Sequence, residues 1–159
     1  YAYQHQGRLR VLDMSWTNPS RAYAAGEIIS TTRDLDRFAN ALLGGDLLPA
    51  DLLAELRAAV PSQGGDSYGL GLEVVPTSEE CGGVYEGHSG GIHGYNSFLL
   101  RSTNGARRLV VSVTLGAVDL TDQEAAIRYV YALQDLMATA LCGAEEPTAP
   151  FATAVTPHL

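Results

Sequence analysis

A histidine, a serine and two glycines follow one another in the stretch EGHSGGIHGYNS, which covers residues 86–97. His88 and Ser89 offer a ring nitrogen and a hydroxyl, and Gly90 and Gly91 leave the backbone open to close approach. Placed at a sheet edge, these groups are the parts needed to hold a carboxylate and to stabilise an oxyanion during acyl transfer. The alternative interpretation is an ordinary tight turn, in which the glycines serve only the backbone.

Other chemistry in this region has weaker support from the sequence. A serine and a histidine can act as nucleophile and base, but neighbouring strand residues point to opposite faces, so we expect no dyad between His88 and Ser89. His88 and His93 lack a third metal ligand. Tyr68 and Tyr95 are interpreted as packed aromatic residues rather than acids. We therefore expect no metal and no cofactor.

Composition restricts the class of protein. The chain has 159 residues, of which 46% are hydrophobic, enough for the core of one globular domain. Its formal net charge of −8 argues against nucleic acid as a partner, because nucleic acid requires a basic face. No run of about 18 apolar residues predicts a membrane span. The first residues lack the apolar region of a signal peptide and resemble the interior of a protein.

The elements that must position these residues form an α+β arrangement, an antiparallel sheet with flanking helices. Apolar periodicity with capping residues predicts helices, and apolar runs bounded by turn residues predict strands. The predicted helices are 30–45, 48–60 and 120–143, and the predicted strands are the second half of 62–75 and the segments 82–90, 94–102 and 107–116. The predicted apolar stripe of the last helix is Ala126, Val130, Leu133, Met137 and Ala140.

The two cysteines, Cys81 and Cys142, leave two states open from the sequence alone. A disulfide would suit an oxidising, extracellular compartment. The alternative is a pair of buried free thiols. If the bridge forms, it closes a loop of roughly 60 residues and contributes about 4 kcal/mol in the chain-entropy account.

Several segments, in order, resemble the C-terminal part of penicillin-recognising serine hydrolases. The resemblance is greatest to secreted D-alanyl-D-alanine carboxypeptidases, which are relatives of class C β-lactamases. It rests on SW…AAGEIISTTRDLDRFANALLGGDLLPADLL, SYGLGLEV, CGGVYEGHSGGIHGY and the helix that ends in LCG. Together these segments cover about residues 14–143, and the resemblance implies a partial β-lactamase or transpeptidase-like fold.

The resemblance implies roles for particular residues. His88, Ser89 and Gly90 are similar to the third motif of the family, Lys/His-Thr/Ser-Gly. His88 would then shape the electrostatics of the site, Ser89 and Gly90 would contact the substrate, and the Ser89 hydroxyl would bind its terminal carboxylate. The backbone N–H of Gly91 would be an oxyanion donor, and Trp16 would lie near the substrate cleft.

The resemblance also implies a disulfide between Cys81 and Cys142 and a secreted protein. Residues 1–143 would be the C-terminal portion of a serine hydrolase domain. Residues 144–159, which contain three prolines and no periodicity, would form a separate tail.

Two departures from the family pattern matter. The ten basic residues are all arginines, so the Ser-x-x-Lys motif that carries the family's nucleophile is absent, and Tyr-x-Asn is absent too. We therefore expect the chain to be the C-terminal part of a longer enzyme, inactive alone and partnered by the N-terminal remainder. The second departure is Glu73, which stands where the carboxypeptidases place an arginine that holds the substrate carboxylate.

Acyl-enzyme hydrolysis is the function that these observations favour. The expected substrates are a peptidoglycan-type peptide, as for a D-alanyl-D-alanine carboxypeptidase, or a small ester or amide. The alternative is a non-catalytic module that binds peptide or penicillin without turnover.

Overall fold

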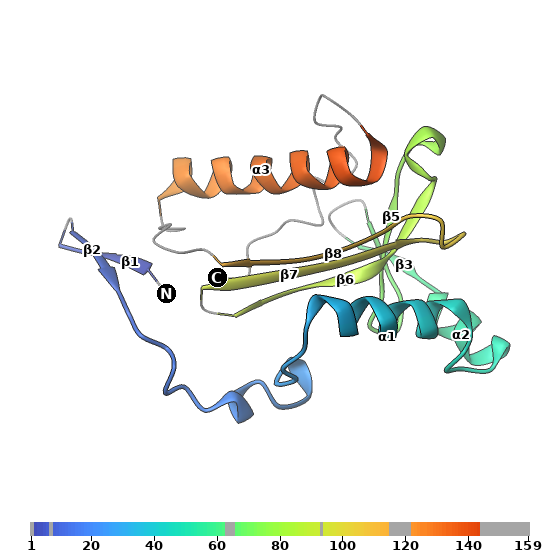
Figure 1. Ribbon diagram of the computed structural model, residues 1–159, viewed down its shortest axis with the longest axis horizontal. Coiled ribbons are helices and arrows are strands. Elements are labelled where there is room, and N and C mark those ends of the chain that lie inside the picture. Colours follow the sequence, from blue (N-terminus) through green and yellow to red (C-terminus); the bar gives the residue numbers. More distant parts are fainter. Residues whose placement is uncertain (1, 7, 63–65, 93, 115–121, 144–159) are drawn as a thin grey trace.

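The computed structural model describes residues 2–6, 8–62, 66–92, 94–114 and 122–143 (Figure 1). Its main sheet is antiparallel, with the strand order β3-β4-β5-β6-β7-β8. These strands are β3 (Val60–Pro61), β4 (Ser67–Tyr68), β5 (Glu73–Pro76), β6 (Val84–Ile92), β7 (Tyr95–Ser102) and β8 (Arg108–Thr114). A separate antiparallel hairpin consists of β1 (Ala2–His5) and β2 (Arg8–Val11).

Helices cover both faces of the main sheet. The α-helices are α1 (Thr32–Gly44), α2 (Ala50–Arg57) and α3 (Gln123–Cys142), and the short 3₁₀ helices are η1 (Pro19–Arg21), η2 (Tyr23–Ala25) and η3 (Glu79–Cys81). Figure 1 shows α3 on one face and α1 with α2 on the other. The structure is therefore an α+β fold with an antiparallel sheet and flanking helices, as predicted.

The main core lies between the sheet and α3. Phe98 and Leu100 alternate along β7 and point to one face, where they pack with Leu133, Met137 and Leu141 of α3. The predicted stripe of α3 is correct at Leu133 and Met137 but wrong at Ala140, which is exposed. The buried stripe continues to Leu141, which lies one full turn beyond Met137.

Helix α1 follows its sequence signals closely. The Thr31 hydroxyl accepts a hydrogen bond from the Asp34 N–H (3.1 Å), and Gly45 ends the helix with a φ of 91°. The predicted strand within 62–75 is partly wrong. Residues 69–72 form a turn between β4 and β5, in which the Gly69 N–H donates to the Leu72 carbonyl (2.8 Å).

The predicted disulfide is present between Cys81 and Cys142, whose Cα atoms lie 4.4 Å apart. It joins η3, just before β6, to the last turn of α3. The same two segments are tied by Arg107, whose Nη1 donates to the carbonyl oxygens of Glu80 (3.2 Å) and Leu141 (2.5 Å). The C-terminal end of α3 is thus fixed to the start of β6.

Two phenols, the fully buried Tyr85 and the partly buried Tyr129, link the stability of this core to pH. Tyr85 is fully buried and donates to the Cys81 carbonyl (2.7 Å), and the Tyr129 hydroxyl accepts from Asn96 Nδ2 (2.8 Å). Burial raises the pKa of both tyrosines above the ordinary value of 10.0. The folded state therefore retains protons that the unfolded chain releases. The stabilisation is complete below pH 10.0 and is lost as the pH rises through the folded-state pKa.

We expect the free energy of unfolding in urea to fall between about pH 9 and about pH 11, where tyrosine ordinarily titrates. The chain has no lysine and its two cysteines are joined, so tyrosine is the side chain that titrates there. The fall should be smaller in the variant Tyr85→Phe/Tyr129→Phe and unchanged in Tyr131→Phe, which alters an exposed residue. If the free energy of unfolding of the double variant fell with pH as steeply as that of the wild-type protein, Tyr85 and Tyr129 would not be the cause.

Candidate active site at the free edge of β6

Half of β6 has a strand on one side only. β5 pairs with β6 from Val84 to Gly87, whereas β7 pairs with it from Tyr85 to Ile92. Within the described part of the chain, residues 88–92 therefore lack a strand partner on the β5 side, and we call them the free edge of β6. Such an edge presents backbone donors and acceptors that can bind an extended segment of another molecule.

Close strand contact sets the position of this edge. A Cβ atom added at Gly87 would lie 1.8 Å from the backbone oxygen of Leu99 on β7, so a larger residue would force the strands apart. Gly87 is the last β6 residue paired with β5, and His88 follows it directly. Gly87 was not among the site residues predicted from the sequence. Its place just before the His-Ser-Gly run was the available signal.

His88 lies at the start of the free edge with its side chain half exposed. Its Nδ1 contacts the Ser89 carbonyl oxygen, and its Nε2 lies 2.9 Å from the Tyr68 hydroxyl. Because a carbonyl only accepts, Nδ1 carries the proton, and in the neutral ring Nε2 accepts from Tyr68. Tyr68 on β4 is thus a partner of the candidate site residue. The interpretation of Tyr68 and Tyr95 as packed aromatic residues was wrong, because both are exposed.

Ser89 and His88 converge on one carboxylate. The Ser89 hydroxyl donates to Glu73 Oε1 at 2.8 Å, and His88 Nδ1 lies 3.9 Å from the same oxygen. The hydroxyl hydrogen of Ser89 therefore goes to Glu73 rather than to His88, in agreement with the expectation that these neighbours form no nucleophile–base dyad. The Glu73 side chain is 21% exposed, so solvent or a ligand can reach its carboxylate.

The other predicted residues differ in how the structure places them. Gly90 and Gly91 lie on the free edge and pair on the β7 side with Ser97 and Asn96. Trp16 lies between β2 and η1 and is 93% exposed, so it packs against neither His88 nor Ser89. The proposed substrate and oxyanion roles of these three residues stay predictions.

No group of three or more His, Cys, Asp or Glu side chains that could hold a metal ion occurs among the described residues. His93, the second histidine of the H-x4-H pair, lies outside them. The helices that the structure describes also include none that is long and apolar enough to cross a membrane.

An ion pair between the partly buried Arg57 and the buried Glu86 supports β6 just before the site. Arg57, at the end of α2, donates through Nε and Nη2 to the two carboxylate oxygens of Glu86 (2.6 and 2.7 Å). Glu86 is two residues before His88, and its side chain is 4% exposed. Arg57 Nη2 also donates to the Leu43 carbonyl of α1 (2.8 Å). The pair therefore joins both helices of this face to the strand that carries the site.

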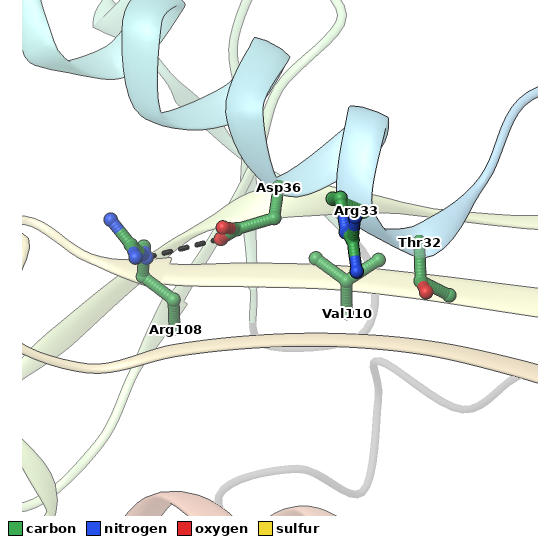
Figure 2. A pocket seen from close by; sticks show the side chains of 5 residues that line it. All are labelled: Thr32, Arg33, Asp36, Arg108 and Val110. Atoms are coloured by element: carbon green, nitrogen blue, oxygen red, sulfur yellow. Dashed lines mark ion pairs between the residues drawn. The ribbon is translucent and has the colours of Figure 1, made fainter.

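Figure 2 shows a hollow between α1 and β8. In the strand order of the sheet, β7 separates β8 from the free edge of β6. The lining residues of the hollow are Thr32, Arg33, Asp36, Arg108 and Val110. Arg108 Nε and Asp36 Oδ1 form an ion pair at 3.0 Å, drawn in Figure 2. The Arg108 Nη1 also donates to Asn40 Oδ1 (2.9 Å), so Arg108 fastens α1 to β8. We assign this hollow to packing, because the residues predicted to do chemistry lie elsewhere.

An antiparallel sheet with helices on both faces, and a His-Ser-Gly strand at an open edge, is the arrangement expected of β-lactamase-like proteins. The comparisons agree with this class. The Beta-lactamase family matches residues 2–134, and the chain belongs to that family.

A crystal structure of a D-stereospecific amidohydrolase from Streptomyces sp. is similar, with a TM-score of 0.65 and 34% sequence identity. The match covers 89% of this chain and 38% of that amidohydrolase, so the chain spans less than half of its neighbour's length. The resemblance to penicillin-recognising serine hydrolases and the β-lactamase-like fold are thereby confirmed.

Proposed function

We propose that this chain is the substrate-binding part of a serine hydrolase that cleaves amides or esters through an acyl-enzyme. The observation that carries the proposal is the free edge of β6, which begins with the third-motif residues His88, Ser89 and Gly90. A substrate lying along this edge would place its reacting carbonyl near the backbone N–H of Gly91, the proposed oxyanion donor. His88, held by Tyr68, would adjust the charge beside that carbonyl.

The substrate class follows from the family and its neighbour. D-alanyl-D-alanine carboxypeptidase-like or β-lactamase-related activity is the finer proposal from the motifs. The D-stereospecificity in the neighbour's name supports acyl groups of D configuration. A peptidoglycan-type peptide and a small D-amide or D-ester are the substrates to test.

The nucleophile would come from the N-terminal remainder of the same enzyme. Ser-x-x-Lys requires a lysine, which this chain does not contain. The segment before α1 exposes large apolar side chains, with Trp16 at 93% and Ile29 at 90% exposed, which supports a surface for that remainder. The disulfide Cys81–Cys142 supports secretion into an oxidising compartment.

The test is the intact mass of the natural protein before and after incubation with a penicillin. We expect a mass well above 16.9 kDa that rises by one penicillin, because the strained lactam acylates the proposed serine. If the protein is longer but gains no adduct, the family assignment of the fold stands and penicillin-type substrates are excluded. A mass of 16.9 kDa without an adduct would favour the alternative, a module that binds peptide or penicillin without turnover.

A further inference from the structure

The group beside Ser89 is an acid, although the proposed function assigns to this hydroxyl a substrate carboxylate. Glu73 Oε1 already accepts the Ser89 hydroxyl hydrogen at 2.8 Å. Glu73 is fixed in this place by the register of β5, where it lies opposite Gly87, the last paired residue before the free edge. A substrate carboxylate at this point would therefore meet a carboxylate and a hydroxyl whose hydrogen is already donated.

Among the described residues, no arginine lies within ion-pair distance of Glu73, and the basic group near it is His88, whose Nδ1 lies 3.9 Å from Glu73 Oε1. The nearby arginine, Arg57, is held by both oxygens of Glu86. Arg107 donates to backbone carbonyls at the far end of β6, and Arg108 is paired with Asp36 under α1. The chain contains no lysine. Among the side chains that the structure describes, the group beside Ser89 is therefore an acceptor, the Glu73 carboxylate, with no arginine paired to it.

We propose that Glu73 selects substrates whose leaving group carries an amine, in place of the terminal carboxylate that a carboxypeptidase holds. This inference rests on the proposed acyl-enzyme function and narrows its substrate class. An ammonium group at the start of the free edge would pair with Glu73, which is 21% exposed and so within reach of a ligand. Glu73 is then a specificity-determining residue, and Ser89 is a positioning residue that orients its carboxylate.

The experiment compares three substrates that differ only in leaving-group charge. They are N-acetyl-D-alanyl amides of 1,2-diaminopropane, D-alaninamide and D-alanine, which present an amine, an uncharged amide and a carboxylate of nearly equal size. Both the binding constant and kcat/KM are measured on the natural protein that contains this chain. For the wild-type protein we expect the amine to be preferred over the carboxylate by about tenfold or more, as for one favourable charged contact.

Variants of Glu73 supply the decisive comparison. Glu73→Gln should make the binding constants and kcat/KM of the three substrates nearly equal. Glu73→Arg should reverse the order of preference, so that the carboxylate substrate is bound and cleaved best. Glu79→Arg, a matched change of charge at an exposed residue of η3, should keep the wild-type order. Thermal unfolding of each variant shows that it is folded.

The two proposals fail in different ways. Turnover of none of the substrates would overturn the hydrolase proposal, while the binding constants would still report on the subsite. Equal binding of the amine and the carboxylate, or a preference for the carboxylate in the wild-type protein, would overturn the role of Glu73. A reversal by Glu79→Arg as large as that by Glu73→Arg would also overturn it, because the effect would then come from net charge alone.

Discussion

Replacing Arg57 with methionine is expected to lower the free energy of unfolding by about 3 kcal/mol, because it leaves a buried carboxylate without its partner. Both oxygens of Glu86 accept hydrogen bonds from Arg57, at 2.6 and 2.7 Å, and the Glu86 side chain is only 4% exposed. Methionine keeps much of the packing of the arginine stem but supplies no charge and no donor. The Leu43 carbonyl also loses the hydrogen bond from Arg57 Nη2.

Urea denaturation of matched variants isolates this effect. Arg37→Met breaks an exposed pair with Asp34, whose side chains are 71% and 59% exposed, and should cost less than about 1 kcal/mol. The double variant Arg57→Met/Glu86→Leu should recover much of the lost stability, since it also removes the carboxylate that Arg57→Met leaves without its partner. If Arg57→Met lowers the free energy of unfolding no more than Arg37→Met does, the Arg57–Glu86 pair contributes little to stability. Packing alone would then hold β6 in place.

Removing the disulfide is expected to lower the free energy of unfolding by about 4 kcal/mol, the chain-entropy contribution of a bridge that closes a long loop. Cys81 and Cys142 are 61 residues apart in the sequence, so the bridge restricts much of the unfolded chain. Arg107 still ties the same two segments, and Met137 still packs in the core. We therefore expect a less stable protein in the variant Cys81→Ser/Cys142→Ser, not the loss of the fold.

Reduction provides the internal control for this prediction. Dithiothreitol should shift the wild-type urea transition toward that of the double variant and leave the double variant unchanged. Equal stability of the oxidised protein, the reduced protein and the double variant would show that the bridge adds nothing to the folded state. A shift in the double variant would reveal an effect of the reagent unrelated to these cysteines.

The parts of the fold that could be predicted from the sequence depend on local signals. Thr31 and Gly45 bound α1 as capping residues, and the alternating apolar residues of β7 and β8 identify two adjacent strands. Each of these signals acts between residues close in the sequence, where backbone preference and side-chain period decide the outcome. Segment 62–75 was predicted less well, because its turn is tied to a distant residue: the Leu70 N–H donates to the Leu56 carbonyl (3.1 Å).

The candidate site also contains residues that could be predicted from the sequence and contacts that could not. His88, Ser89, Gly90 and Gly91 were identifiable from the sequence, because residue type and order suffice to suggest their chemistry. The contact of Tyr68 with His88 could not be predicted, since it joins residues 20 positions apart on different strands. Its formation depends on strand register, which local preferences do not specify.

The sequence by itself determined the family resemblance, the α+β class, the helix boundaries near capping residues and the types of groups at the site. The predicted end of the second helix at residue 60 was wrong, because α2 ends at Arg57 and Val60 belongs to β3. Tertiary structure alone decided that the pairing of β6 with β5 ends at Gly87, which opens the free edge, and that Glu73 contacts Ser89 across that junction. The physical reason is the register of two strands: a shift of one residue would have turned Glu73 to the other face of the sheet and left the Ser89 hydroxyl free for a carboxylate.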